Sequence, residues 1–143
     1  MNATGSGPAN IDERYRVLLV LWFAICTSMV TYLAFIHFAP VKPAVNQKLT
    51  LMLNTVGLIP VAVSFLVKQV LLTKAAETQR IEQVQVAYII SLALCEISGI
   101  LAVVDYRLTG SSYYYVGLAI GGLGLLLHFP RRQHLLDATP RQL

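Results

Sequence analysis

Residues 84–104 read VQVAYIISLALCEISGILAVV, an apolar run in which only Glu96 is charged. At about 1.5 Å rise per residue, a helix of about 20 residues matches the hydrocarbon core of a bilayer, which is about 30 Å thick. Glu96 falls within about one turn of the midpoint of that helix. An ionised carboxylate is costly at this depth. We therefore expect Glu96 to be protonated, paired, or facing a polar cavity.

The composition of the whole chain indicates that lipid is its solvent. Of its 143 residues, 56% are hydrophobic and 13% are charged, whereas soluble domains carry about 25% charged residues. These ionic groups are too few to cover a soluble surface. The net charge of +4 comes from basic residues near the ends of apolar runs, not from one basic face. We therefore expect the bilayer as a partner and no nucleic acid.

Four apolar runs predict membrane spans at about 17–38, 49–72, 84–104 and 113–129. The first run is too long for the apolar core of a signal peptide, so we interpret it as a retained span. Because the connections are short, consecutive helices should be antiparallel. The expected fold is an all-α polytopic membrane protein, an antiparallel four-transmembrane-helix bundle. Residues 14–129 form this domain, between a flexible N-terminal tail at 1–13 and a loose, polar C-terminal tail at 130–143.

Basic residues predict the orientation of the four spans. Cytoplasmic flanks carry an excess of Lys and Arg. With four spans, the two tails and the middle loop share one side, which holds eight of the 11 basic residues. The opposite side holds Lys42, Lys48 and Arg107. We therefore expect a multi-pass protein of a bacterial inner membrane, with both termini cytoplasmic.

Small residues predict which helices approach closely. Ala87, Ser91, Cys95 and Gly99 recur every four residues, so they share one face of the third helix. Small residues at this spacing let transmembrane backbones come together. The fourth helix offers a matching set, namely Gly117, Gly121 and Gly124. The prediction is that the third and fourth helices pack most closely of all.

Depth in the membrane suggests hydrogen-bond partners for Glu96. Ser28 and Thr31 on the first span lie near its level, Asn54 on the second lies about one turn further out, and Ser91 is on its own helix. Lys68 lies about 15 Å nearer the cytoplasm, too far for an ion pair. Two interpretations stay open. Glu96 is either a protonatable or ion-binding carboxylate, or a protonated group that hydrogen-bonds a neighbouring helix.

Neither a metal site nor a catalytic motif is found in the sequence. His37 belongs to the outer end of the first span, whereas His128 and His134 flank Pro130 near the inner end of the fourth. All three are expected to be interface residues and not ligands. Cys26 and Cys95 sit within apolar runs as packing residues. No catalytic triad, phosphate-binding loop or dinucleotide fingerprint is present. We expect no cofactor and no enzymatic activity.

Residues 89–104, IISLALCEISGILAVV, resemble the second helix of the proteolipid subunit c of rotary ATP synthases. That helix carries a carboxylate among Ala, Leu and Gly, followed by a small residue and an aliphatic run. The resemblance implies that Glu96 matches the proton-carrying carboxylate, with Ala93 and Gly99 as its close-packed surroundings. The chain as a whole also resembles small bacterial membrane proteins with four spans.

These observations lead to a main expectation and two alternatives. The main one is a non-enzymatic structural or accessory subunit of a membrane assembly, in which Glu96 is a buried hydrogen-bonding anchor. Its partner would be another protein or further copies of this chain. The first alternative is a proton- or ion-handling component with Glu96 as the protonatable site. The second is lipid or quinone binding between helices, which needs an open apolar cleft.

Overall fold

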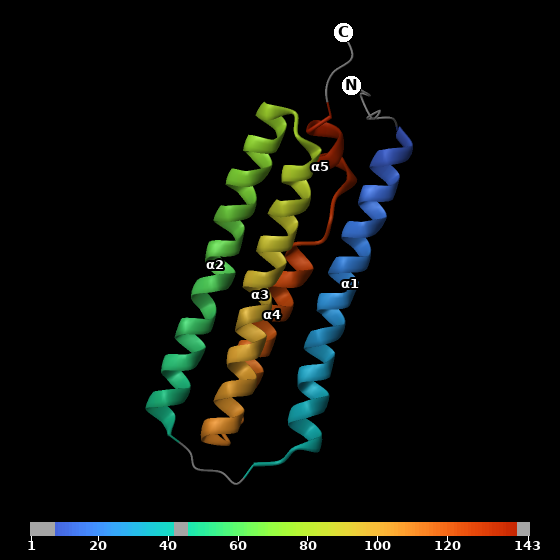
Figure 1. Cartoon of the computed structure of the whole chain (residues 1–143). Helices are drawn as coiled ribbons and strands as arrows, with labels where there is room; N and C mark the ends of the chain where they lie inside the picture. Colours follow the sequence, from blue (N-terminus) through green and yellow to red (C-terminus); the bar gives the residue numbers. More distant parts are fainter. Residues whose placement is uncertain (1–7, 42–45, 140–143) are drawn as a thin grey trace.

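The chain folds into antiparallel helices that run side by side (Figure 1). The computed structural model describes residues 8–41 and 46–139. Within those ranges there is no strand, so the expectation of an all-α chain is confirmed there. The helices are α1 (Pro8–Phe38), α2 (Gln47–Thr78), α3 (Ile81–Thr109), α4 (Tyr114–Leu127) and α5 (Arg132–Asp137).

Three of these helices are long and apolar enough to cross a membrane. They are α1 from Ile11, α2 and α3, while α4 is a shorter apolar helix. The helices extend beyond the predicted spans at several ends. Residues 8–13, predicted to be part of a flexible tail, form the start of α1, and residues 1–7 lie outside the described residues. Asp105, predicted to begin a turn, lies inside α3 because the helix continues for another turn to Thr109.

Local chemistry sets the ends of α2 and α3. Asn46 caps α2, since its side-chain oxygen accepts a hydrogen bond from the backbone N–H of Leu49 at 3.2 Å. At the other end Gln79 adopts a left-handed backbone with a φ of 50°, and its N–H returns to Ala75 O. Gly110 closes α3 in the same way with a φ of 59°, a conformation that glycine adopts without strain. The α2–α3 hairpin therefore turns within Gln79 and Arg80.

The C-terminal part of the chain is not a loose tail as far as residue 139. The helix α4 ends at Leu127, before the predicted end of the fourth span, and the chain resumes as α5. Leu135 and Ala138 are fully buried against Ile11, Leu18 and Tyr88. Burial of these apolar side chains explains why the segment folds back. The predicted polar tail at 130–143 is wrong for residues 132–137, and residues 140–143 lie outside the described residues.

The helix α3 lies at the centre of the bundle. It contacts all four other helices, and it is the most buried of the three long helices while α1 is the least. Its contact with α2 is more extensive than its contact with α4. The largest contact of α3 is therefore with α2, while the prediction that the third and fourth helices pack most closely concerns distance and stays a prediction. The difference in extent follows from length, because α4 has 14 residues and α2 has 32.

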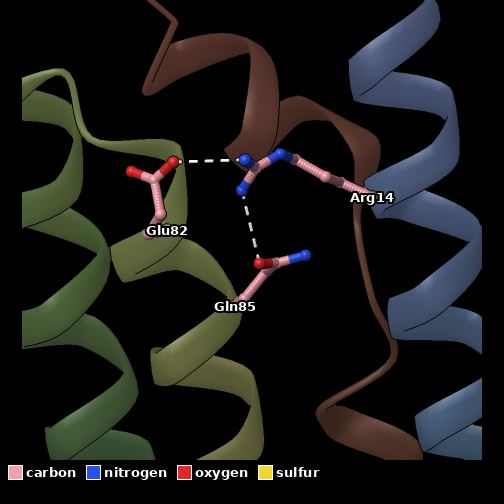
Figure 2. A network of polar contacts seen from close by, with 3 residues as sticks. All are labelled: Arg14, Glu82 and Gln85. Atoms are coloured by element: carbon pink, nitrogen blue, oxygen red, sulfur yellow. Dashed lines mark hydrogen bonds and ion pairs between the residues drawn. The ribbon is translucent and has the colours of Figure 1, made fainter. Parts of the chain in front are cut away.

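Polar contacts tie α1 to α3 at the end of the bundle that carries the α2–α3 turn. Arg14 Nη2 lies 3.1 Å from Glu82 Oε1, and Arg14 Nη1 donates to Gln85 Oε1 at 3.3 Å (Figure 2). Further along, Trp22 Nε1 donates to the backbone oxygen of Leu125 in α4 at 2.8 Å. The lightly packed α1 is therefore held by separate polar contacts along its length.

Candidate functional site

Glu96 faces α1, and two hydroxyl groups of α1 meet the same carboxyl oxygen. Ser28 Oγ lies 2.7 Å from Glu96 Oε1, and Tyr32 Oη lies 2.9 Å from that atom. Ser28 and Tyr32 are one turn apart on α1, so both side chains point to one side of that helix. Glu96 itself is partly exposed. The second carboxyl oxygen has no hydrogen-bond partner among the described residues.

Of the four candidate partners, the structure brings only Ser28 to Glu96. Thr31 is exposed and donates to Thr27 O of its own helix. Asn54 donates to Asp105 Oδ2 at 3.4 Å. Ser91 Oγ lies 2.7 Å from Ala87 O and 3.3 Å from Ser64 O, and it donates to the nearer of the two. Depth in the membrane therefore identified Ser28 correctly. The other three side chains lie on helix faces that do not point to the Glu96 carboxyl group.

The sequence reading missed Tyr32 as a partner of Glu96. A tyrosine hydroxyl extends further from its backbone than a serine hydroxyl, so Tyr32 reaches Glu96 from one turn along α1. The signal that could have found it is the spacing between Ser28 and Tyr32, which places two hydroxyl groups on one helical face. Such a pair opposite a lone acid predicts an interhelical hydrogen-bond cluster.

The predicted small-residue stripe of α3 is buried throughout, but it packs against three helices, α1, α2 and α4, and not against one. Ala87, Ser91, Cys95 and Gly99 are all buried. Ser91 meets α2 through Ser64 O. A Cβ atom added at Gly99 would lie 2.5 Å from Met29 Sδ on α1. Cys95 Sγ lies 3.5 Å from Ser64 Oγ on α2 and also faces Gly124 on α4.

The glycines of α4 provide the close approach to α3 that the sequence predicts. A Cβ added at Gly121 would lie 3.1 Å from Cys95 O, and one at Gly124 would lie 2.8 Å from Cys95 Sγ. At Gly117 the added atom would meet Ala102 Cβ at 2.9 Å. All three positions are buried. Small residues are thus required where α4 crosses the backbone of α3.

A second acid, Asp105, is more deeply buried than Glu96, with 1% of its surface exposed. It lies about two and a half turns further along α3, hence on the opposite face. Its carboxyl oxygens accept from Thr109 Oγ1 at 3.1 Å and from Asn54 Nδ2 at 3.4 Å. The sequence does not predict this buried position, because the apolar run ends at Val104 and a turn is expected from Asp105.

A buried histidine packs between α2 and α4. His128 is fully buried within the protein, and its expected position near the inner end of the fourth span stays a prediction. Its Nδ1 lies 2.7 Å from Gly124 O, and its Nε2 lies 3.3 Å from Ser64 Oγ. The Ser64 hydroxyl also donates to Val61 O at 2.6 Å. Ser64 and His128 are both fully buried, so neither side chain is accessible from the surface.

Metal-ligating residues do not gather around Glu96 in the part of the chain that the structure describes. Residues 8–41 and 46–139 contain no group of three or more His, Cys, Asp or Glu side chains able to hold a metal ion. The largely apolar hollow at Leu19–Ala24 is lined by α1 alone. Glu96 is therefore an interhelical hydrogen-bonding site between α1 and α3. No protein-family model, curated protein or solved structure matches this chain.

Proposed function

We propose that this protein is a non-enzymatic membrane protein, a structural or accessory subunit of a membrane assembly. In it, Glu96 is a neutral hydrogen-bonding anchor that fixes α1 against α3. Both termini are cytoplasmic, and α4 with the segment after it completes a fourth crossing. The role is thus one of holding helices in place and not of chemical turnover.

This proposal rests on the two short contacts that the Ser28 hydroxyl group makes. Ser28 Oγ lies 2.7 Å from both Ile25 O and Glu96 Oε1. One hydroxyl has one proton, so it can donate to only one of these oxygens. If Glu96 is protonated, its own O–H donates to Ser28, and Ser28 donates to Ile25 O. Both short contacts are then hydrogen bonds, which favours the neutral carboxyl over the carboxylate.

The arrangement of the helices supports four crossings. The start of α1, the turn between α2 and α3, and α5 lie at one end of the bundle (Figure 1). The Gly110 turn lies at the other end. A chain whose two halves each go out and return crosses an even number of times. Backbone that is not helical is tolerated at membrane depth when protein covers it, and His128 and Pro130, which follow α4, are buried.

Exposed apolar side chains support contact with lipid and with a partner protein or a second copy. They include Phe23, Val30 and Phe35 on α1, and Leu51, Ile59 and Leu66 on α2. Monomeric soluble proteins rarely expose apolar surface on this scale. A lipid environment satisfies such faces, and any subunit interface would be taken from the same surface.

Infrared difference spectroscopy of the protein in lipid tests the protonation of Glu96. The expected result is a protonated-carboxyl band that is present in the wild type and absent in Glu96→Gln, because the group is held neutral in an interhelical hydrogen bond. Glu96→Gln should retain the wild-type thermal stability, since an amide can also bond both hydroxyl groups. Loss of that band at neutral pH would overturn the anchor.

The second carboxyl oxygen supports one further candidate, proton or ion handling. That oxygen has no partner among the described residues, and Glu96 is partly exposed. The resemblance of residues 89–104 to a proteolipid helix points the same way. Under this candidate, a hydrophobic carbodiimide would label Glu96 in a pH-dependent manner.

A further inference from the structure

A basic pocket lies where α2, the end of α4 and α5 meet. Its volume is about 330 Å³, within the range of about 300–1,000 Å³ found for small-molecule sites. Its polar lining is Lys68, Gln69, Arg131 and His134. Its apolar lining is Phe65, Leu72 and Leu127. The pocket therefore combines basic and apolar side chains in its lining.

The positive charge of this basic pocket is not balanced within the described chain. No carboxylate lines it. Neither Lys68 nor Arg131 takes part in the ion pairs of the described residues, which join Arg14 to Glu82 and Arg132 to Asp12. An anion would therefore find two available cationic groups side by side.

The charges of Lys68 and Arg131 both act on His134 in the basic pocket. Burial first, then the charges of Lys68 and Arg131, lower the pKa of His134 below its ordinary value of 6.5, and only Asp137 opposes them. Asp137 itself accepts a hydrogen bond from Gln133 at 2.9 Å. Lys68 is held over the ring of Tyr88, with Nζ 4.5 Å from the ring centroid. Its ammonium group is thus positioned before any ligand arrives.

The apolar lining places this pocket at a boundary between two environments. Phe65 and Leu127 are exposed and continue the apolar surfaces of α2 and α4. The segment beyond carries Arg131, Arg132 and Asp137, which suit water and headgroups. In a bilayer this is the level at which acyl chains give way to phosphates.

We propose that the basic pocket binds the phosphate headgroup of an anionic phospholipid. Lys68 and Arg131 donate charge-assisted hydrogen bonds to the phosphate oxygens. Phe65, Leu72 and Leu127 contact the first carbons of an acyl chain. Basic pockets between transmembrane helices on the cytoplasmic side suit anionic headgroups. This site is independent of the protonation of Glu96.

The test measures lipid retained by the full chain. The protein is reconstituted in phosphatidylcholine discs doped with phosphatidylglycerol, and native mass spectrometry then counts the phosphatidylglycerol that stays bound. Arg131→Gln and Lys68→Gln should each lower retention about fivefold, the factor that corresponds to about 1 kcal/mol per basic residue at an anionic surface. The control Lys74→Gln removes an exposed lysine of the same helix that lies outside the basic pocket.

Two results would overturn the site. The first is equal retention in Arg131→Gln and Lys74→Gln. The second is stabilisation by inorganic phosphate that matches that of the lipid, which would assign the pocket to a free anion. Thermal unfolding in pure phosphatidylcholine checks that each variant folds. Because Arg131 is exposed, Arg131→Gln keeps the test valid even if Lys68→Gln does not fold, and Arg131→Lys should restore retention.

Discussion

At the scale of single residues, the Glu96 cluster is a small network that couples two helices. Ser28 and Tyr32 both meet Oε1 of Glu96, so removal of either hydroxyl leaves the other contact in place. Interhelical hydrogen bonds in membranes contribute about 0.6 kcal/mol on average and at most about 1.7 kcal/mol. The cluster should therefore set the position of α1 more than the overall stability of the bundle.

We expect Ser28→Ala and Tyr32→Phe to destabilise the protein by about 0.6 to 1.7 kcal/mol each. Glu96→Leu should remove both contacts at once. Thermal unfolding in detergent gives these values, and a double-mutant cycle with Glu96→Leu gives the coupling. Thr27→Ala and Tyr113→Phe are the controls, because both residues are exposed and Thr27 bonds only within α1. A coupling energy of zero between Glu96 and the two hydroxyl groups would show that they do not form a network.

His134 predicts a pH dependence of stability. Its Nδ1 lies 2.7 Å from Tyr88 Oη, and burial with Lys68 and Arg131 lowers its pKa below 6.5. The unfolded chain then binds the proton more readily than the folded one. The His134 contribution is therefore fully present above pH 6.5 and is lost as the pH falls through 6.5 towards the lowered pKa.

The melting temperature measured in neutral detergent should accordingly fall below pH 6.5. In His134→Gln this part of the pH dependence should vanish, since glutamine does not titrate in that range. His37→Gln serves as the matched histidine control, because His37 is exposed at the other end of α1. An unchanged pH profile in His134→Gln would show that the proton binds elsewhere.

At the scale of helices, Gly121 of α4 is closely surrounded by other atoms, whereas its neighbour Gly122 has open space beside it. A Cβ at Gly121 would lie 3.0 Å from Met29 Cε and 3.1 Å from Cys95 O, whereas one at Gly122 would meet nothing within 4 Å. The first neighbour is the end of a flexible side chain, but the second is backbone. Only a shift of the whole helix can relieve the second contact.

Gly121→Leu should therefore destabilise the bundle by about 1–3 kcal/mol, the cost of overpacking a filled interior. Gly122→Leu, which adds the same side chain to the adjacent position of the helix, should be close to neutral. Both are measured by thermal unfolding in one detergent. Equal losses in the two variants would show that the contacts around Gly121 do not explain why glycine is needed there.

The sequence predicted apolar helices better than it predicted their contacts. Run length and the lone Glu96 identified the third helix, and depth selected Ser28 from α1. It did not identify Tyr32, because its reach depends on how α1 is rotated. The last turn of α3 was missed since Asp105 looks like the end of an apolar run. The position of α5 follows from burial of Leu135 by distant segments, which local pattern does not encode.

At the scale of the whole molecule, the proposed crossings can be tested by side-specific labelling. In a chain with Cys26 and Cys95 replaced, single cysteines at Gln79, Ser112 and Gln133 are exposed probes. Gln79→Cys and Gln133→Cys should react from the cytoplasmic side, and Ser112→Cys from the opposite side, because α4 and the segment after it return the chain. Labelling of Gln133→Cys together with Ser112→Cys would mean three crossings.

The contacts of α1 determine when in synthesis it can find its place. Ser28 and Tyr32 meet a residue 68 and 64 positions later in the chain, and Trp22 meets one 103 positions later. Until those residues have been synthesised, α1 lacks these interhelical contacts. The hydroxyl groups of Thr27, Ser28 and Thr31 hydrogen-bond to carbonyl oxygens of α1 itself, so they are satisfied without a neighbouring helix. The first helix to be made is therefore among the last to be secured.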